Sequence, residues 1–220
     1  MTGKLDGKSA LITGAASGAG LTAARALAAA GCTLHLADAN ESDLETEARN
    51  LEEDFEVEIE IHPEDLCETV NIGSLALECD EVDILICASG ALPVGTVDDL
   101  GDDDWRDGWN LAFFSAITLI REILESQCDR GRGLIAVLMT GSLESDEDDI
   151  CRSTANAALS TVIRALGVSA AKKGVCVVGI HADEPDGFEG LGELLDELLS
   201  SASPEAGGSV LTLEKSTAGV

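Results

Sequence analysis

Glycines near the start of the sequence are spaced as in a loop that binds a phosphate group. Residues 13–20 read Thr-Gly-Ala-Ala-Ser-Gly-Ala-Gly between a short apolar run and an alanine-rich stretch, an order typical of strand, turn and helix. Gly14 permits the tight turn, Gly18 lets a ligand approach the backbone, and Gly20 lets the helix pack on its strand. We therefore expect the N–H groups that follow Ser17, at the start of the helix, to face an anion.

An acidic residue at the end of the next apolar run extends this prediction. Residues 33–37 have the pattern of a buried strand, and Asp38 follows them directly. A carboxylate at that place can accept hydrogen bonds from a ribose diol, and it would repel a 2′-phosphate. The glycine loop and Asp38 together predict a dinucleotide site that prefers NAD to NADP.

The charge of the chain excludes two classes of partner. The sequence has 42 acidic and 13 basic residues, which gives a formal net charge of −29. Such a chain repels nucleic acid and anionic membranes, so we expect neither as a partner. The acidic surface is explained equally by a salt-adapted cytosol, by an acidic lineage or by docking onto a basic partner.

Length and composition indicate one α/β domain over residues 1–220, with 45% hydrophobic residues to form its core. No apolar stretch reaches the length that spans a membrane, and residues 1–6 lack the features of a signal peptide, so we expect a cytoplasmic protein. Seven cysteines are scattered without the spacing of metal ligands. We expect reduced thiols that pack in the core, and no metal.

Apolar runs alternate with amphipathic segments along the whole chain, which predicts a doubly wound parallel sheet with helices on both faces. Strands are expected near 9–13, 33–37, 56–61, 83–87, 133–139 and 175–181, with an edge strand at 209–213. Helices are expected near 19–30, 41–53, 66–78, 102–128, 151–171 and 188–201.

The glycine pattern resembles the Thr-Gly-x-x-x-Gly-x-Gly fingerprint of the short-chain dehydrogenase/reductase family, and the resemblance extends over nearly the whole chain. It implies a Rossmann-like sheet of order 3-2-1-4-5-6-7 and an NAD site. Asp65 and Leu66 take the place where the family's acidic residue meets the adenine amino group. The family's Asn-Asn-Ala-Gly motif reads Cys-Ala-Ser-Gly at residues 87–90, so only its glycine, Gly90, is retained.

The resemblance fails at the positions that carry the family's chemistry. Counting from Trp105, the catalytic asparagine falls on Ala112, and Asn110 is two residues early, about 200° away around a helix. The catalytic serine falls on Thr140, whose hydroxyl could still orient a carbonyl. Ser142 is a less favoured substitute for that serine.

The Tyr-x-x-x-Lys helix of the family aligns with a segment in which Arg152 replaces the tyrosine and Asn156 the lysine. A spacing of four puts both side chains on one helix face. Arginine keeps its proton at physiological pH and asparagine does not titrate, so the acid/base pair is absent. A shift of one residue gives Cys151 and Ala155, which are no better, and the sequence has no tyrosine.

Three further features bear on activity. We interpret Cys87 as a buried packing residue and His181, at the end of the sixth strand, as a packing residue rather than a proton donor. Only 37 residues follow Asp183, so the region that closes over substrate in the family is predicted to be shortened by roughly twenty to thirty residues.

These observations lead to a favoured hypothesis and two alternatives. The favoured one is a catalytically degenerate family member, a structural or regulatory subunit that binds NAD(H) weakly. The first alternative is an active NAD-dependent dehydrogenase in which Thr140, Arg152 or His181 transfers the proton. The second is a self-assembling NAD(H) sensor.

The expected partner is an active paralogue of the same family. Family members assemble through the helices that correspond to 102–128 and 151–171, which here carry more apolar residues than one side facing the sheet can bury. We therefore expect a heterotetramer with two copies of each subunit. The apolar residues are Leu111, Phe113, Phe114, Ile117, Ile120, Ile123, Leu124, Leu159, Val162, Ile163 and Leu166.

Overall fold

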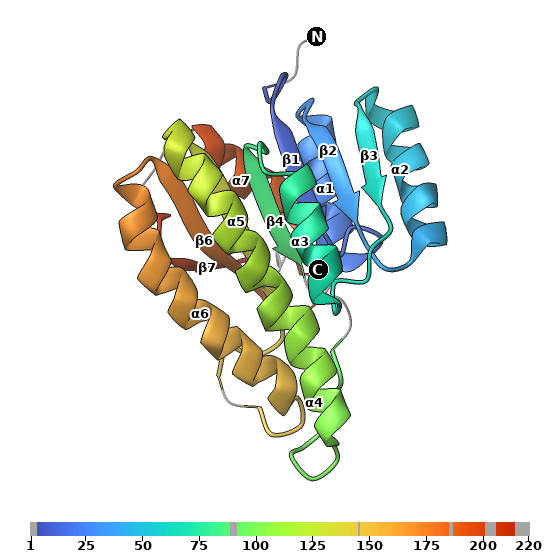
Figure 1. Ribbon diagram of the computed structural model, residues 1–220, viewed down its shortest axis with the longest axis vertical. Helices are drawn as coiled ribbons and strands as arrows, with labels where there is room; N and C mark the ends of the chain where they lie inside the picture. The colour runs from blue at the N-terminus through green and yellow to red at the C-terminus, as the bar shows by residue number, and fades with distance from the viewer. Residues whose placement is uncertain (1–3, 89–91, 145, 185–186, 201–205, 214–220) are drawn as a thin grey trace, which may run out of the picture.

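The computed structural model describes residues 4–88, 92–144, 146–184, 187–200 and 206–213, and these residues form a seven-stranded parallel sheet between two layers of helices (Figure 1). The strand order is β3-β2-β1-β4-β5-β6-β7, which confirms the predicted fold class. The strands are β1 (Ser9–Thr13), β2 (Thr33–Ala37), β3 (Ile59–His62), β4 (Ile84–Ala88), β5 (Gly133–Thr140), β6 (Val175–Ala182) and β7 (Val210–Thr212).

Helices cover both faces of the sheet. The helices are α1 (Gly18–Ala29), α2 (Glu41–Phe55), α3 (Thr69–Glu78), α4 (Asp102–Trp109), α5 (Ser115–Arg130), α6 (Ile150–Ala171) and α7 (Leu191–Ser200), with a π-helical segment η1 (Asn110–Phe114) between α4 and α5. One hydrophobic core lies under α1, α2 and α7, and the other under α3, α5 and α6, which cross the near face in Figure 1.

The central strands β1, β4, β5 and β6 are buried on both faces because each alternates its side chains between the two cores, whereas the edge strands β3 and β7 are partly exposed. In β1, Ala10 and Ile12 pack into the first core, whereas Leu11 packs into the second. All three side chains are fully buried. The short apolar runs of the sequence therefore predicted strands correctly, since a parallel sheet between helices has no polar face.

Several predicted boundaries differ from the structure: the helices expected at 66–78 and 188–201, for example, are observed at Thr69–Glu78 and Leu191–Ser200. The third strand begins at Ile59 because α2 continues to Phe55 and ends on Glu56, which takes the left-handed conformation with φ 54°. The predicted helix 102–128 is divided by the π-helical segment, where the wider turn brings the rings of Trp109 and Phe113 to 5.2 Å between centroids.

The order of the strands determines where a ligand site is expected. The chain crosses to β2 and β3 on one side of β1 and to β4, β5 and β6 on the other, so the loops after β1 and β4 diverge. Ligands of open α/β sheets bind in the crevice at such a point, beyond the carboxyl ends of the strands. Among the described residues, no helix has both the length and the apolar character needed to cross a bilayer.

Candidate functional site

The glycine loop is held tightly against the end of β4. The hydroxyl of Thr13 donates to the carbonyl of Ala88 at 3.2 Å and accepts from the N–H of Ala88 at 3.1 Å. A Cβ on Gly14 would lie 2.6 Å from that carbonyl oxygen, and a Cβ on Gly20 would overlap the carbonyl of Gly14. Both glycines are therefore required by close backbone packing, as the spacing predicted.

Gly18 differs from these two glycines because it faces open space. Its φ is +54°, and a Cβ added there would have no atom within 4 Å. Ser17, the residue before it, is exposed and caps α1 with its backbone only, since its side chain makes no capping hydrogen bond. The start of α1 thus leaves a hydroxyl and free N–H groups beside open space, which is the arrangement that an anion requires.

A cavity of about 120 Å³ lies next to the glycine loop and brings together Asp38, Asp65 and Leu66. The carboxylate of Asp38 accepts from the N–H of Ala16 at 3.2 Å and from the N–H of Asn40 at 3.0 Å. Asp65 is exposed and Leu66 is buried. The structure therefore collects these three predicted residues in one place, whereas Gly90 lies outside the described residues.

Outside the family motifs, four other residues that line this cavity were not predicted as site residues, and one of them, Ala39, simply follows Asp38. Glu64 adds a third carboxylate, and Leu111 and Ser115 reach it from the helices on the other side of the crevice. Glu64 neighbours a predicted residue and could have been included on that ground. Leu111 and Ser115 could not, because their position depends on how η1 and α5 pack over the sheet.

The four positions at which this sequence departs from the family's catalytic residues line a second, much smaller cavity. Ala112, Thr140, Arg152 and Asn156 all line a space of about 20 Å³ beside Ala19 of α1. Such a volume is close to that of one or two water molecules. Asn110 does not line it, which agrees with its assignment as a residue outside the catalytic register.

Arg152 takes the place that the resemblance assigns to a tyrosine, and two nitrogens of its guanidinium donate hydrogen bonds. Nε donates to Asp149 Oδ2 at 2.7 Å, and Nη1 donates to Thr140 Oγ1 at 2.8 Å. The side chains of Arg152 and Asp149 are only 17% and 22% exposed. The amide of Asn156 donates to the carbonyl of Thr140 at 2.9 Å, so it also serves to hold the end of β5.

Two other residues that were considered for chemistry, His181 and Cys87, are buried in the protein. His181 is 3% exposed, and its Nε2 donates to the carbonyl of Gly141 at 2.5 Å. Cys87 is buried, and burial raises the pKa of its thiol to about 12, so the thiol is protonated at neutral pH. These environments agree with the packing roles that the sequence indicated for both residues.

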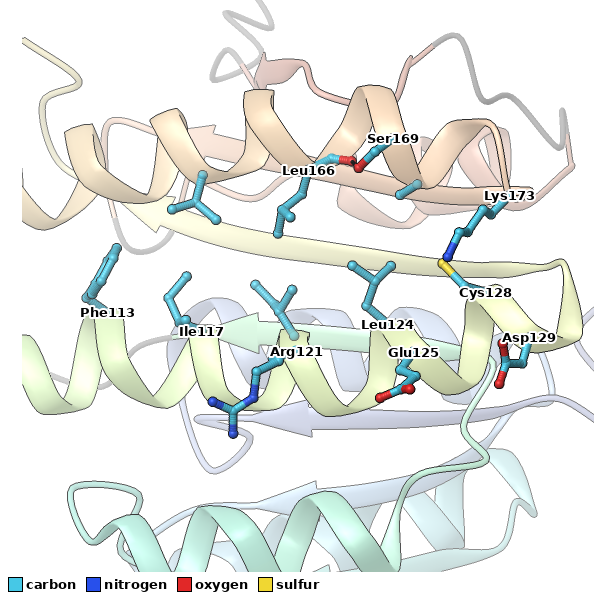
Figure 2. A pocket seen from close by; sticks show the side chains of 13 residues that line it. Phe113, Ile117, Arg121, Leu124, Glu125, Cys128, Asp129, Leu166, Ser169 and Lys173 are labelled. Atoms are coloured by element: carbon cyan, nitrogen blue, oxygen red, sulfur yellow. Dashed lines mark hydrogen bonds between the residues drawn. The ribbon is translucent and has the colours of Figure 1, made fainter.

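An apolar groove of about 650 Å³ runs between α5 and α6 on the outer surface (Figure 2). Phe113, Ile117 and Leu124 point into it from one side and Leu166 from the other, as Figure 2 shows. Ile123 and Ile163, by contrast, are fully buried under the helices. The two helices therefore divide their apolar residues between the core and this groove, with Arg121, Glu125, Asp129 and Lys173 at its rim.

A cluster of two histidines and a cysteine was missed by the sequence. One donor atom each of His35, His62 and Cys79 lies within 4.8 Å of the other two. The residues are 27 and 17 positions apart, which is not a spacing typical of metal ligands. Only the pairing of β2 with β3 and the packing of α3 bring them together.

Comparison with known proteins gives a consistent result. A family model described as short chain dehydrogenase matches residues 8–184. The chain is 28% identical over 138 residues to 2,3-dihydro-2,3-dihydroxybenzoate dehydrogenase of Bacillus subtilis. The aligned region covers 61% of this chain and 52% of that protein. It is 26% identical over 194 residues to dehydrogenase/reductase SDR family member 6 of Rattus norvegicus, with 83% and 74% covered. The chain thus spans about half of the bacterial relative's length.

Solved structures share the fold at lower identity. L-sorbose reductase from Gluconobacter frateurii, complexed with NADPH and L-sorbose, superposes with a TM-score of 0.86 at 20% identity, over 98% of both chains. A 7α-hydroxysteroid dehydrogenase complexed with NADH gives 0.83 at 21% identity, over 97% of this chain and 95% of that one.

Proposed function

Because the chain belongs to the short chain dehydrogenase family of oxidoreductases, we propose that it is a catalytically degenerate member, a subunit that keeps the nucleotide fold and does not itself transfer hydride. The observation that carries this proposal is the engagement of Arg152. Its guanidinium bridges Asp149 and Thr140 at the place where a proton donor to substrate is required. A guanidinium keeps its proton at any physiological pH, so it cannot act as a general acid and base.

The alternative of an active enzyme requires another group to move the proton. The hydroxyl of Thr140 accepts from Arg152, and the imidazole of His181 is buried on the carbonyl of Gly141. The cavity of about 20 Å³ that the described residues form at this place is smaller than a nicotinamide ring with a substrate beside it. These three observations favour the inactive subunit over the enzyme.

The residues fit one half of a dinucleotide. Gly14 and Gly18 shape the loop, and Asp38 and Asp65 line the cavity of about 120 Å³ where an adenosine moiety would lie. The nicotinamide half would reach the small cavity at Thr140, whose lining includes no lysine that could bind its ribose. NAD would supply a hydride acceptor in an active relative. Here we propose weak binding of NAD(H) through the adenosine half.

The groove between α5 and α6 supports a hetero-oligomer. Its apolar residues continue along both helices, and a helix pair with a similar apolar face would cover them. We propose that the occupant is the corresponding helix pair of an active family member, in a heterotetramer with two copies of each subunit. A subunit without chemistry would then support the chemistry of its partner.

Two measurements test this proposal, one on the purified chain and one on native extract. The chain should show no NADH-linked turnover on a panel of alcohols, ketones and hydroxyacyl thioesters, because none of the described residues that line the small cavity is suited to exchange the proton. Turnover that disappears in Arg152→Ala would overturn the degenerate assignment. Size-exclusion chromatography with light scattering, on native extract, should show a particle that contains an active family member. A stable monomer at micromolar concentration would refute the interface, and a homotetramer from native extract would refute the partner.

A matched pair of variants locates the interface. Leu124→Asp places a carboxylate in the groove and should dissociate the assembly, since a buried charge without a partner opposes association strongly. Val70→Asp makes the same change on α3, where the valine is 79% exposed, and should leave the assembly intact. Equal behaviour of the two variants would contradict the assignment of the groove.

A further inference from the structure

Two histidines and a cysteine meet under one edge of the sheet. β2 and β3 pair in a register that sets His35 opposite Glu60 and Ala37 opposite His62, so both imidazoles lie on the same face. α3 packs on that face and ends at Cys79, its C-cap residue. Three separate elements thus contribute one donor each.

The donor atoms lie at distances suited to one metal ion. His35 Nδ1 is 3.3 Å from His62 Nε2, and Cys79 Sγ is 3.9 Å from the same Nε2. A tetrahedral zinc ion with ordinary bond lengths sets its nitrogen ligands about 3.3 Å apart and its nitrogen and sulfur ligands about 3.6 Å apart. The cluster therefore needs only small side-chain movements to ligate zinc.

We propose that His35 Nδ1, His62 Nε2 and Cys79 Sγ bind a Zn²⁺ ion, with the carboxylate of Glu60 as the fourth ligand. Glu60 Oε2 is 3.4 Å from His35 Nδ1. Glu60 is not among the donors that all lie within 4.8 Å of one another, so its exposed side chain has to rotate to complete the tetrahedron around the ion. Two imidazoles, a thiolate and a carboxylate form a donor set typical of zinc. Because all four positions are taken by the protein, the ion would be structural.

A second carboxylate orients one of the ligands. Glu78 Oε2 is 3.5 Å from His62 Nδ1, the ring nitrogen that faces away from the proposed ion. Histidines that bind metals commonly donate this second N–H to a carboxylate, which fixes the tautomer and makes the ligating nitrogen more basic. Glu60 and Glu78 are 65% and 63% exposed and reach solvent, whereas His62 and Cys79 are buried.

The proposed ion would also support the nucleotide loops. The carbonyl of His62 accepts the N–H of Asp38 at 3.3 Å and the N–H of Glu64 at 2.9 Å. Both residues line the cavity of about 120 Å³ beside the glycine loop. A metal that fixes His62 would therefore hold the ends of β2 and β3 in the positions that this cavity needs.

The competing explanation is a pair of packed histidines that needs no ion. The rings lie 5.5 Å apart between centroids and 27° from parallel, and one imidazole can donate to the other. That arrangement predicts no affinity for a metal. Zinc ligation predicts one ion per chain and a sulfur ligand, so the two explanations differ in a measurable way.

Cobalt substitution provides the test. The full chain is stripped with a chelator and titrated with Co²⁺ and then with Zn²⁺. We expect a thiolate-to-cobalt charge-transfer absorption that saturates at one equivalent and that Zn²⁺ displaces. Cys79→Ala should lose this absorption, whereas Cys176→Ala, which removes another buried thiol, should keep it. Glu78→Gln should weaken Zn²⁺ binding about 10- to 100-fold.

Three results would overturn the proposal: no charge-transfer absorption with equimolar Co²⁺, an absorption that survives in Cys79→Ala, or an equal loss in Cys176→Ala. If Cys79→Ala does not fold, His35→Gln replaces it, since that side chain is 19% exposed and tolerates a polar substitute. This variant should weaken Zn²⁺ binding by at least about 100-fold, as expected for loss of a ligand. Unchanged affinity in His35→Gln would also refute the site.

Discussion

The guanidinium of Arg152 donates a hydrogen bond to the hydroxyl of Thr140, with 2.8 Å between Nη1 and Oγ1. These two residues take the positions that the family resemblance assigns to the catalytic tyrosine and serine. Their contact converts a pair that would face a substrate into one that closes the end of β5 onto α6. Arg152 and Thr140 thus stabilise the fold at the positions of the family's catalytic residues, and this stabilisation can be measured.

Replacement of Arg152 by alanine should lower the free energy of unfolding by about 2 kcal/mol, because Asp149 and Thr140 lose a charged hydrogen-bond donor in a partly buried place. Chemical denaturation measures this change. Arg106→Ala removes an arginine that is 65% exposed and paired with Asp102 and Asp103, so it should cost no more than about 0.5 kcal/mol. Similar losses in the two variants would show that the bridge does not stabilise the fold.

Gly18 should matter for nucleotide binding more than for stability. Gly18→Ala adds a methyl group that meets no protein atom within 4 Å and costs about 1 kcal/mol for the left-handed conformation. The same methyl group projects into the open space where a phosphate would lie, so calorimetry should show a large loss of NAD(H) affinity. Gly7→Ala is the matched control: its φ is +75° and its surroundings are equally open. It should lose the same stability and no affinity.

Asp38 should set the preference for NAD(H) over NADP(H). Its carboxylate lies beside the cavity that would hold the adenosine ribose, and it would repel a 2′-phosphate. In Asp38→Asn, the ratio of NADP(H) to NAD(H) affinity should rise at least about 10-fold. Glu45→Gln removes one exposed carboxylate of α2 and controls for the change in net charge. Tighter binding of NADP(H) than of NAD(H) by the unaltered chain would refute the preference.

Two helical glycines should respond in opposite directions to alanine. A Cβ on Gly167 of α6 would overlap the backbone of Gly208, before β7, so Gly167→Ala should destabilise the fold by about 3 kcal/mol or more. Gly73 of α3 has no atom within 4 Å of an added Cβ. Gly73→Ala should stabilise by about 0.5–1 kcal/mol through helix propensity. Thermal and chemical unfolding of both variants check the signs.

The net charge of −29 should make stability depend on salt. Repulsion among exposed carboxylates opposes the compact state, and the screening length falls from about 10 Å at 0.1 M to about 3 Å at 1 M salt. The melting temperature should therefore rise steeply between 0.1 and 1 M KCl. A neutral osmolyte at the same osmolality is the control. If the osmolyte raises the melting temperature as much as KCl does, screening is not the cause.

The sequence by itself predicted the architecture, because each strand and helix is encoded locally. The apolar run of β1 and the glycines at 14, 18 and 20 carry their own backbone requirements, and the structure confirms the strand order that the resemblance implied. The short apolar strands could be recognised without tertiary information since a sheet covered on both faces needs apolar residues at successive positions. The boundary at Glu56 could not, because a left-handed residue that is not glycine has no clear sequence signal.

Only the tertiary structure decided how distant side chains meet. Arg152 could be recognised as a replacement from its position in the sequence, but its bridge to Asp149 and Thr140 depends on where α6 crosses the end of β5. His35, His62 and Cys79 gave no signal at all in the sequence. Their donor atoms converge because strand register and helix packing bring separate segments together, and no local pattern of residues records such long-range contacts.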